Sequence, residues 1–80
     1  MMKELNENAI LKEAMAERGA TQTALAKKLG MSQNNLSGIV NRVRPSVSAF
    51  KDVLDKLEYD VVIVDRRTGE LVWKIEQLQK

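Results

Sequence analysis

The feature that most constrains the fold of this sequence is a connection of only three residues, 30–32, between two short stretches with helical periodicity. Gly30 tolerates the left-handed backbone that ends a helix, and the Ser32 hydroxyl can cap the helix that follows. We expect these two helices over residues 22–29 and 33–41. Because the connection is so short, the helices must cross steeply.

Two further amphipathic helices are expected, one on each side of this pair. Apolar residues recur at three- and four-residue steps over residues 4–18, and a glycine ends that stretch. Thr21 stands where the second helix needs a cap. After a loop at residues 42–45, Ser46 can cap a fourth helix over 47–57. The positions of that helix expected to face inward are Val47, Phe50, Val53, Leu54 and Leu57.

Further along the chain, the periodicity of the apolar residues changes from 3.6 to two, over residues 59–75. A β-hairpin is expected there, with a glycine-containing turn at residues 66–69. The sequence therefore predicts a mainly α fold with a C-terminal β-hairpin. We expect a four-helix domain over residues 1–58, the hairpin over 59–76 and a frayed tail over 77–80.

Charge is distributed unevenly along the chain. The stretch from Arg18 to Lys51 contains six basic residues and no acidic one, whereas the segments before and after it each have two more acidic than basic residues. A polyanion would release counterions only where that basic stretch faces it. The pattern therefore predicts a nucleic-acid backbone as the partner of one surface.

Several other classes of protein are disfavoured. Cysteine and histidine are both absent, so we expect no disulfide, no metal site and no cofactor. An enzyme is not expected either, because no phosphate-binding glycine loop or nucleophile motif is present. The longest apolar run, residues 61–64, is far shorter than the ~20 residues that cross a bilayer. We expect a protein of the reducing cytoplasm without a membrane segment.

The helix expected over residues 33–41 combines an apolar side with a polar, uncharged one. Six apolar residues are expected to face the interior from the two crossing helices and their turn: Leu25, Leu29, Met31, Leu36, Ile39 and Val40. The small Ala26 is expected where the two helices come closest. The outward residues are Gln33, Asn34, Ser37 and Asn41. Amide side chains can bond an adenine edge through N6 and N7. A merely solvated face usually mixes Lys and Glu, so this face favours base reading.

Residues suited to phosphate contacts surround that helix. The candidates are Gln22, Thr23, Lys28, Arg42, Arg44 and Ser46. The first two lie at the amino-terminal end of the second helix, where the helix dipole is positive, and Ser46 lies at the corresponding end of the fourth. Lys27 and Lys28 point about 100° apart, so at most one of them should meet the backbone while the other is solvated.

With these residues in place, the run from Thr21 to Val40 resembles the lambda-repressor-like helix-turn-helix family, the type of Cro, phage repressors and xenobiotic-response-element regulators. The positions that carry the resemblance are Gln22, Leu25, Ala26, Leu29, Gly30, Met31, Leu36 and Ile39. The resemblance implies double-stranded DNA as the partner and assigns roles to Gln22 as a phosphate clamp, Ser32 as a cap and phosphate ligand, Gln33 and Asn34 as leading base readers, and Ser37 as a further reader. The implied function is a sequence-specific transcription regulator, most simply a repressor that occludes polymerase.

The hairpin is expected to join two copies of the chain. An isolated two-stranded ribbon is marginal in water, and this one is apolar on both faces. The residues expected at the subunit contact are Val61, Ile63, Leu71, Trp73 and Ile75, against Val62, Val64 and Val72 on the other face. A homodimer would hold two reading helices about 34 Å apart, which suits a palindromic operator.

Two alternatives are kept for the hairpin. In the first, Trp73 and its neighbours pack back on the first and fourth helices, and no dimer is needed. In the second, the chain is an antitoxin-like interaction module, whose hairpin docks on a different protein. A second chain that co-purifies in a fixed ratio would favour this last alternative.

Overall fold

The structure is a computed structural model that describes residues 4–42 and 44–76. Its helices are α1 (Glu7–Arg18), α2 (Gln22–Leu29), α3 (Gln33–Ser37) with its continuation η1 (Gly38–Arg42), and α4 (Val47–Lys56). Strands β1 (Val62–Val64) and β2 (Leu71–Lys74) follow. The predicted mainly α fold with a C-terminal hairpin is confirmed. We call residues 4–58 the body and residues 59–76 the arm.

The four α-helices begin where a short polar side chain caps their first free amides. Thr21, Ser32 and Ser46 accept hydrogen bonds from the amides three residues on, as predicted. Asn6 does the same for α1, so that helix begins at Glu7 and not at residue 4. After α2, Gly30 has a φ of 69°, the left-handed turn on which the predicted short connection depends.

The third helix is not a regular α-helix over residues 33–41. From Gly38 it widens into the π-helix η1. Asn8 of α1 donates from its Nδ2 to the carbonyl oxygens of Ile39 and Val40, both at 2.9 Å, so two carbonyls of the widened turn are bonded to another helix. A glycine in the interior of a helix weakens the α-helical preference at the point where the widening begins.

The core lies between the helices of the body. Its largest fully buried side chains are Leu11, Leu25, Leu36, Val40 and Val53. The predicted inward face of α4 is wrong at one position, because Val47 lies in the first turn of α4 and is 67% exposed. Lys51 is buried instead, where its Nζ lies 2.6 Å from Asp55 Oδ2. A buried lysine is tolerated when its charge is paired in this way.

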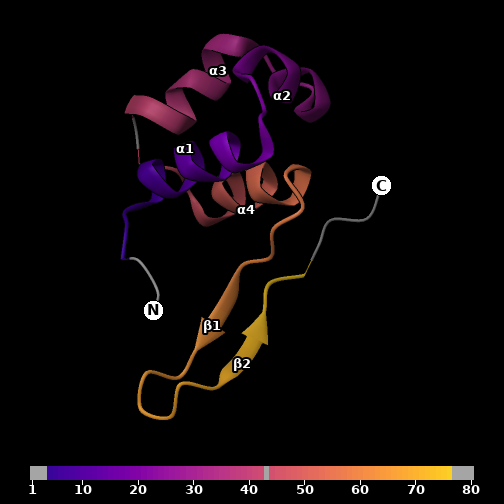
Figure 1. The fold of residues 1–80 in the computed structure, drawn as a ribbon. Coiled ribbons are helices and arrows are strands. Elements are labelled where there is room, and N and C mark those ends of the chain that lie inside the picture. Colours follow the sequence, from indigo (N-terminus) through magenta and orange to yellow (C-terminus); the bar gives the residue numbers. More distant parts are fainter. Residues whose placement is uncertain (1–3, 43, 77–80) are drawn as a thin grey trace.

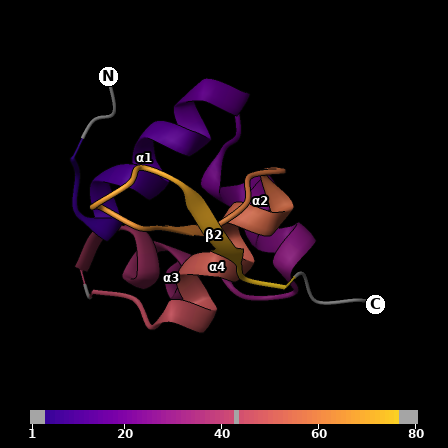
Figure 2. The same cartoon turned by 90° about the horizontal axis from the view of Figure 1, so that it is seen from below.

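The arm projects from the body on the side opposite to α2 and α3 (Figure 1). Seen from below, it lies in front of the helices (Figure 2). Its strands are shorter than the predicted residues 59–75, and Gly69 closes the turn with a φ of 79°. Ile63 pairs with Trp73, but a register shift places Val64 opposite Leu71. Opposite residues share a face, so the predicted grouping of Leu71 with Ile63 is wrong.

The arm covers little of its own apolar surface. Trp73 is 67% exposed, and Ile63, Leu71, Val62 and Val72 are exposed as well. Val61 and Ile75 are half-buried. The alternative in which Trp73 packs back on the first and fourth helices is therefore wrong.

Candidate nucleic-acid interface

Helix α3 is anchored on one side and open on the other. Leu36 is fully buried in the core, whereas Gln33 and Asn34 on the same helix are exposed to solvent. Neighbouring α2 and α3 lie together at the end of the body that is remote from the arm (Figure 1). A helix held in this way presents amide donors and acceptors outward, as major-groove reading requires.

The other two predicted base readers lie where the helix widens. Asn41 is exposed and donates from its Nδ2 to the Ser37 Oγ at 3.2 Å, so the two side chains form one polar unit. Ser37 itself is half-buried. Gly38 lies between them, and a Cβ at this position would meet no atom within 4 Å, so the surface there is open.

Four hydroxyl or amide side chains predicted to bind phosphate lie at helix starts. Gln22 is half-buried and Thr23 is exposed, both in the first turn of α2. The Ser46 Oγ accepts the amide of Ala49 at 3.1 Å. The Ser32 Oγ likewise accepts the amide of Asn35. Because a hydroxyl accepts and donates at once, each capping serine retains a proton for a phosphate oxygen.

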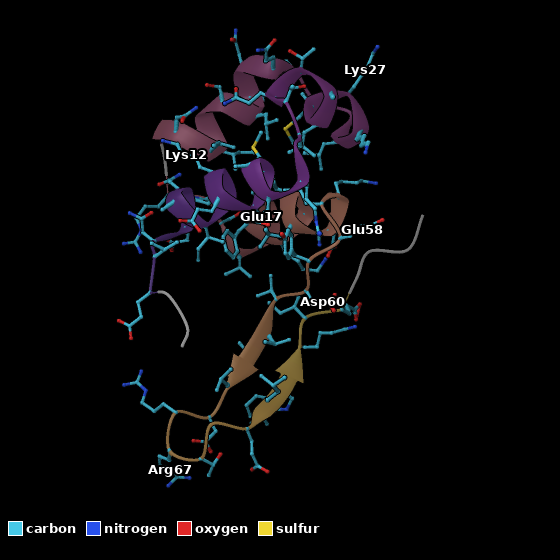
Figure 3. All side chains as sticks on the ribbon, in the orientation of Figure 1. Lys12, Glu17, Lys27, Glu58, Asp60 and Arg67 are labelled. Carbon is cyan, nitrogen blue, oxygen red and sulfur yellow. The ribbon has the colours of Figure 1, made fainter. Side chains whose placement is uncertain are left out.

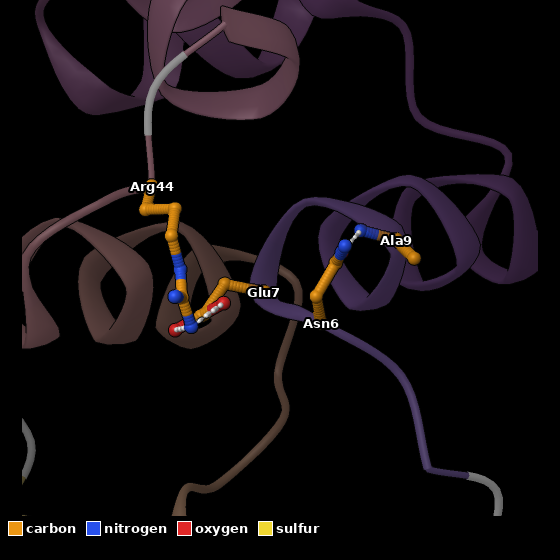
Figure 4. A network of polar contacts seen from close by, with 4 residues as sticks. All are labelled: Asn6, Glu7, Ala9 and Arg44. Carbon is orange, nitrogen blue, oxygen red and sulfur yellow. Dashed lines mark hydrogen bonds and ion pairs between the residues drawn. The ribbon is translucent and has the colours of Figure 1, made fainter.

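Arg44, also predicted to bind phosphate, is held by the first helix (Figure 4). Its Nη2 lies 3.1 Å from Glu7 Oε2 and 3.2 Å from Oε1. The pKa of Glu7 is lowered from its ordinary value, first by the hydrogen bond from its own backbone amide and then by the Arg44 side chain. The arginine is exposed, so a phosphate at this position would compete with one carboxylate.

The basic stretch of the sequence does not form one basic surface. Lys51 is buried in the core beside Asp55, and the Nε of Arg18 donates to the carbonyl oxygen of Leu57 at 2.8 Å. Lys27 and Lys28 are exposed on α2, and Lys27 points away from the body (Figure 3). The side chain of Arg42 lies outside the part of the chain that the structure describes. The count of basic residues thus overstates the charge offered to a polyanion.

One hollow brings two kinds of predicted residue together. The base-reading candidate Asn34 lines it with the phosphate candidates Arg44 and Ser46, and Gly38 forms part of its wall. The hollow therefore joins α3 to the loop that precedes α4. A groove edge and its flanking phosphate can be contacted side by side at such a place.

Sequence reasoning missed two residues that shape this surface, Asn8 and Glu7, and a third, Glu58, that lies after the end of α4. Asn8 bonds the carbonyls of the widened turn, Glu7 holds Arg44, and Glu58 has a φ of 66°. The first two act across more than thirty positions of the chain, so no local pattern points to them. An interior glycine followed by the weak helix former Asn41 was the available signal for the widening.

Residues 4–42 and 44–76 contain no group of three or more His, Cys, Asp or Glu side chains placed to hold a metal ion. Within the same ranges, no helix has the length and apolarity to cross a membrane.

A model of a helix-turn-helix family matches residues 11–64, which run from within α1 to the end of β1 and make up more than half of the chain. No curated protein and no solved structure matches the chain.

Proposed function

The chain belongs to the lambda-repressor-like helix-turn-helix family and is a DNA-binding transcription regulator, and from this premise we propose that it is a homodimeric repressor of a palindromic operator. The observation that carries the proposal is the exposed amide face of α3, formed by Gln33 and Asn34 and fixed in place by buried Leu36. It would act in the cytoplasm, by occupying a site that polymerase needs.

In this proposal, the residues of the interface have two separate tasks. Gln33 and Asn34 read base edges, with Ser37 and Asn41 as further readers toward the end of the helix. Gln22, Thr23, Lys28, Ser32, Arg42, Arg44 and Ser46 contact phosphates around them. Phosphate contacts fix the position of the helix, and the base contacts select the sequence.

The second half of the proposal concerns a second copy of the chain. The arm exposes Trp73, Ile63 and Leu71 to water, and a two-stranded ribbon with so much apolar surface is marginal by itself. A second arm packed on the face that carries Ile63 and Trp73 would cover those two side chains. Since the arm leaves the body opposite α3, a two-fold axis running along both arms would leave both reading helices facing one duplex.

Base reading is tested by substituting Gln33 with alanine. We expect this change to weaken binding to the preferred duplex by about 1–3 kcal/mol, or roughly 5- to 150-fold, and to leave binding to unrelated duplexes unchanged. Lys28→Ala is the contrasting variant, because the loss of a phosphate contact weakens binding to all sequences and lowers the salt dependence. Equal losses on all duplexes for Gln33→Ala would contradict the assigned role.

The dimer is tested by sedimentation of the purified chain. Trp73→Ala is expected to weaken self-association by about tenfold or more, as central aromatic residues of interfaces do. Val47→Ala is the matched control, because Val47 is equally exposed but lies on the body. A chain that stays monomeric at millimolar concentration, or two variants that weaken association equally, would contradict the proposal.

A second candidate function is an antitoxin-like interaction module. It is favoured by one observation, the exposure of Val62 and Val72 as well as that of Ile63 and Trp73. A single two-fold contact between arms covers one face and leaves the other for a different protein. Purification of the protein from its native host distinguishes the two candidate functions. A second chain that co-purifies in a fixed ratio supports the interaction module, and a homodimer without a partner excludes it.

A further inference from the structure

We propose that Arg18 is a positioning residue that fixes the direction of the arm relative to the reading helix, and so sets the half-site spacing that the dimer accepts. The inference rests on the proposed function, because a spacing exists only for a dimer on DNA. Arg18 lies in the last turn of α1, outside the base-reading face and outside both strands. It acts through the joint between body and arm.

The joint is short and, within the described residues, carries the packing of the arm against the core. Tyr59 and Val61 are the arm residues that pack against the buried core within the described chain. Beyond them, both strands are mostly exposed, and the arm's ion pair between Lys74 and Asp60 links two arm residues to each other. The direction of the arm is therefore decided at residues 57–61.

The backbone of this joint turns sharply at the end of α4. The amide of Glu58 donates to the carbonyl of Asp55 at 3.0 Å, and the amide of Tyr59 donates to that of Leu54 at 2.9 Å. This is the helix ending that usually needs glycine, but here Glu58 has the left-handed φ of 66°. Within the described residues, no other non-glycine residue has a positive φ. Such a turn persists only where its surroundings hold it.

Arg18 makes contact with three consecutive residues of that turn. Its Nε donates to the carbonyl oxygen of Leu57 at 2.8 Å, and its Nη2 donates to that of Glu58 at 3.4 Å. The centre of its guanidinium lies 4.1 Å from the centroid of the Tyr59 ring. A guanidinium is planar, with donors in a fixed fork, so these contacts orient two peptide planes and one ring together. Its positive charge also suits the carboxyl end of α4.

A fixed joint has a consequence that can be measured on DNA. Each base pair added between two half-sites moves the second one by about 3.4 Å and rotates it by about 35° around the duplex. A dimer with stiff joints meets both half-sites at one spacing only, whereas a dimer with loose joints adapts to several. When the spacing does not fit, the two subunits cannot bind both half-sites at once, and the gain in affinity from the second half-site is lost.

The test compares duplexes that differ only in spacing. Dissociation constants are measured for the best palindrome, for versions lengthened and shortened by two base pairs, and for a single half-site. For the wild-type chain, we expect the altered spacings to weaken binding on the order of a hundredfold. For Arg18→Met, we expect that penalty to fall about tenfold, with half-site binding and dimerisation unchanged. Lys12→Met is the matched control, because it removes an exposed positive charge from the same helix and should keep the full penalty (Figure 3).

The outcomes separate this inference from the proposed function. A folded, dimeric Arg18→Met variant with the wild-type spacing penalty overturns the role of Arg18 and leaves the dimeric repressor intact. A wild-type dimer that prefers the palindrome but shows no spacing preference overturns the inference alone. A wild-type chain that binds the palindrome no more tightly than the single half-site overturns both. If Arg18→Met does not fold, Arg18→Lys takes its place, since an ammonium keeps the charge but cannot span two carbonyls and a ring. A reduced penalty in that variant supports the inference, and a full penalty overturns it.

Discussion

The body and the arm are held together in different ways. The body surrounds fully buried side chains contributed by α1, α2, α3, η1 and α4, among them Leu11 and Leu36. The arm has its cross-strand pairs and a tight turn, but its large apolar side chains, Trp73 above all, face water. The comparison teaches that a defined backbone and a sufficient core are separate properties. The body has both, and the arm depends on whatever covers it.

The largest expected effect is on the free energy of unfolding, and it distinguishes truncation of Leu36 in the body from truncation of Trp73 in the arm. Leu36→Ala should lower the free energy of unfolding by about 3 kcal/mol at any protein concentration, because it leaves a cavity in the core. Stability of the whole chain is on the order of 4–12 kcal/mol, so this is a large share. Trp73→Ala should change the free energy of unfolding by less than about 0.5 kcal/mol in dilute protein. The change should grow as the protein concentration approaches the range in which the dimer forms. Urea unfolding at several concentrations measures both.

One outcome would contradict this distinction between the body and the arm. If Trp73→Ala destabilised dilute protein as strongly as Leu36→Ala, the arm would be part of the same cooperative unit as the body.

A smaller effect is expected at the joint between the two regions. Glu58→Gly should raise the free energy of unfolding by about 0.5 kcal/mol, since relief of the left-handed strain outweighs the greater freedom of glycine in the unfolded chain. For a domain of this size, the melting temperature should rise by about 2–4 °C. Glu58→Ala is the control, because it removes the carboxylate but keeps the Cβ, and it should show no such rise. A lower melting temperature for Glu58→Gly would mean that the joint is not strained.

The smallest effect concerns the ion pair that ties α1 to the loop before α4. The pKa of Glu7 is lowered in the folded chain, so its contribution to stability is full above the ordinary value of 4.5 and is lost as the pH falls below it, through the folded value. Glu7→Gln should therefore flatten the dependence of the melting temperature on pH in that acidic range. Arg44→Met should remove only part of the dependence, because the backbone hydrogen bond to Glu7 remains. Identical curves for wild type and Glu7→Gln would contradict this assignment.

The local features of the body could be predicted from the sequence, because they depend on neighbouring residues. The caps at Thr21, Ser32 and Ser46 and the left-handed Gly30 each involve bonds within a few positions of the chain. The exposure of Gln33 and Asn34 followed from the spacing of the apolar residues around them. Helix starts and an exposed amide face are thus accessible to pattern alone.

The features that escaped prediction depend on contacts between distant segments. The widening at Gly38 is supported by Asn8, thirty residues earlier, and Lys51 of α4 is buried beside Asp55 while Val47 of the same helix is exposed. A count of charges could not show that three of the basic residues, Arg18, Arg44 and Lys51, bond other groups of the same chain. The direction of the arm depends on one guanidinium and one strained backbone angle.

The separation of α3 from the arm by the whole body has an evolutionary consequence. Substitutions in α3 that would change which bases its amide face recognises need not disturb the strands, which lie at the far end of the molecule. Gene duplicates that diverge in the third helix would then still assemble with one another through the strands that they keep in common. Such a mixed pair would recognise an asymmetric site, and one ancestral protein would yield three distinct specificities from two genes.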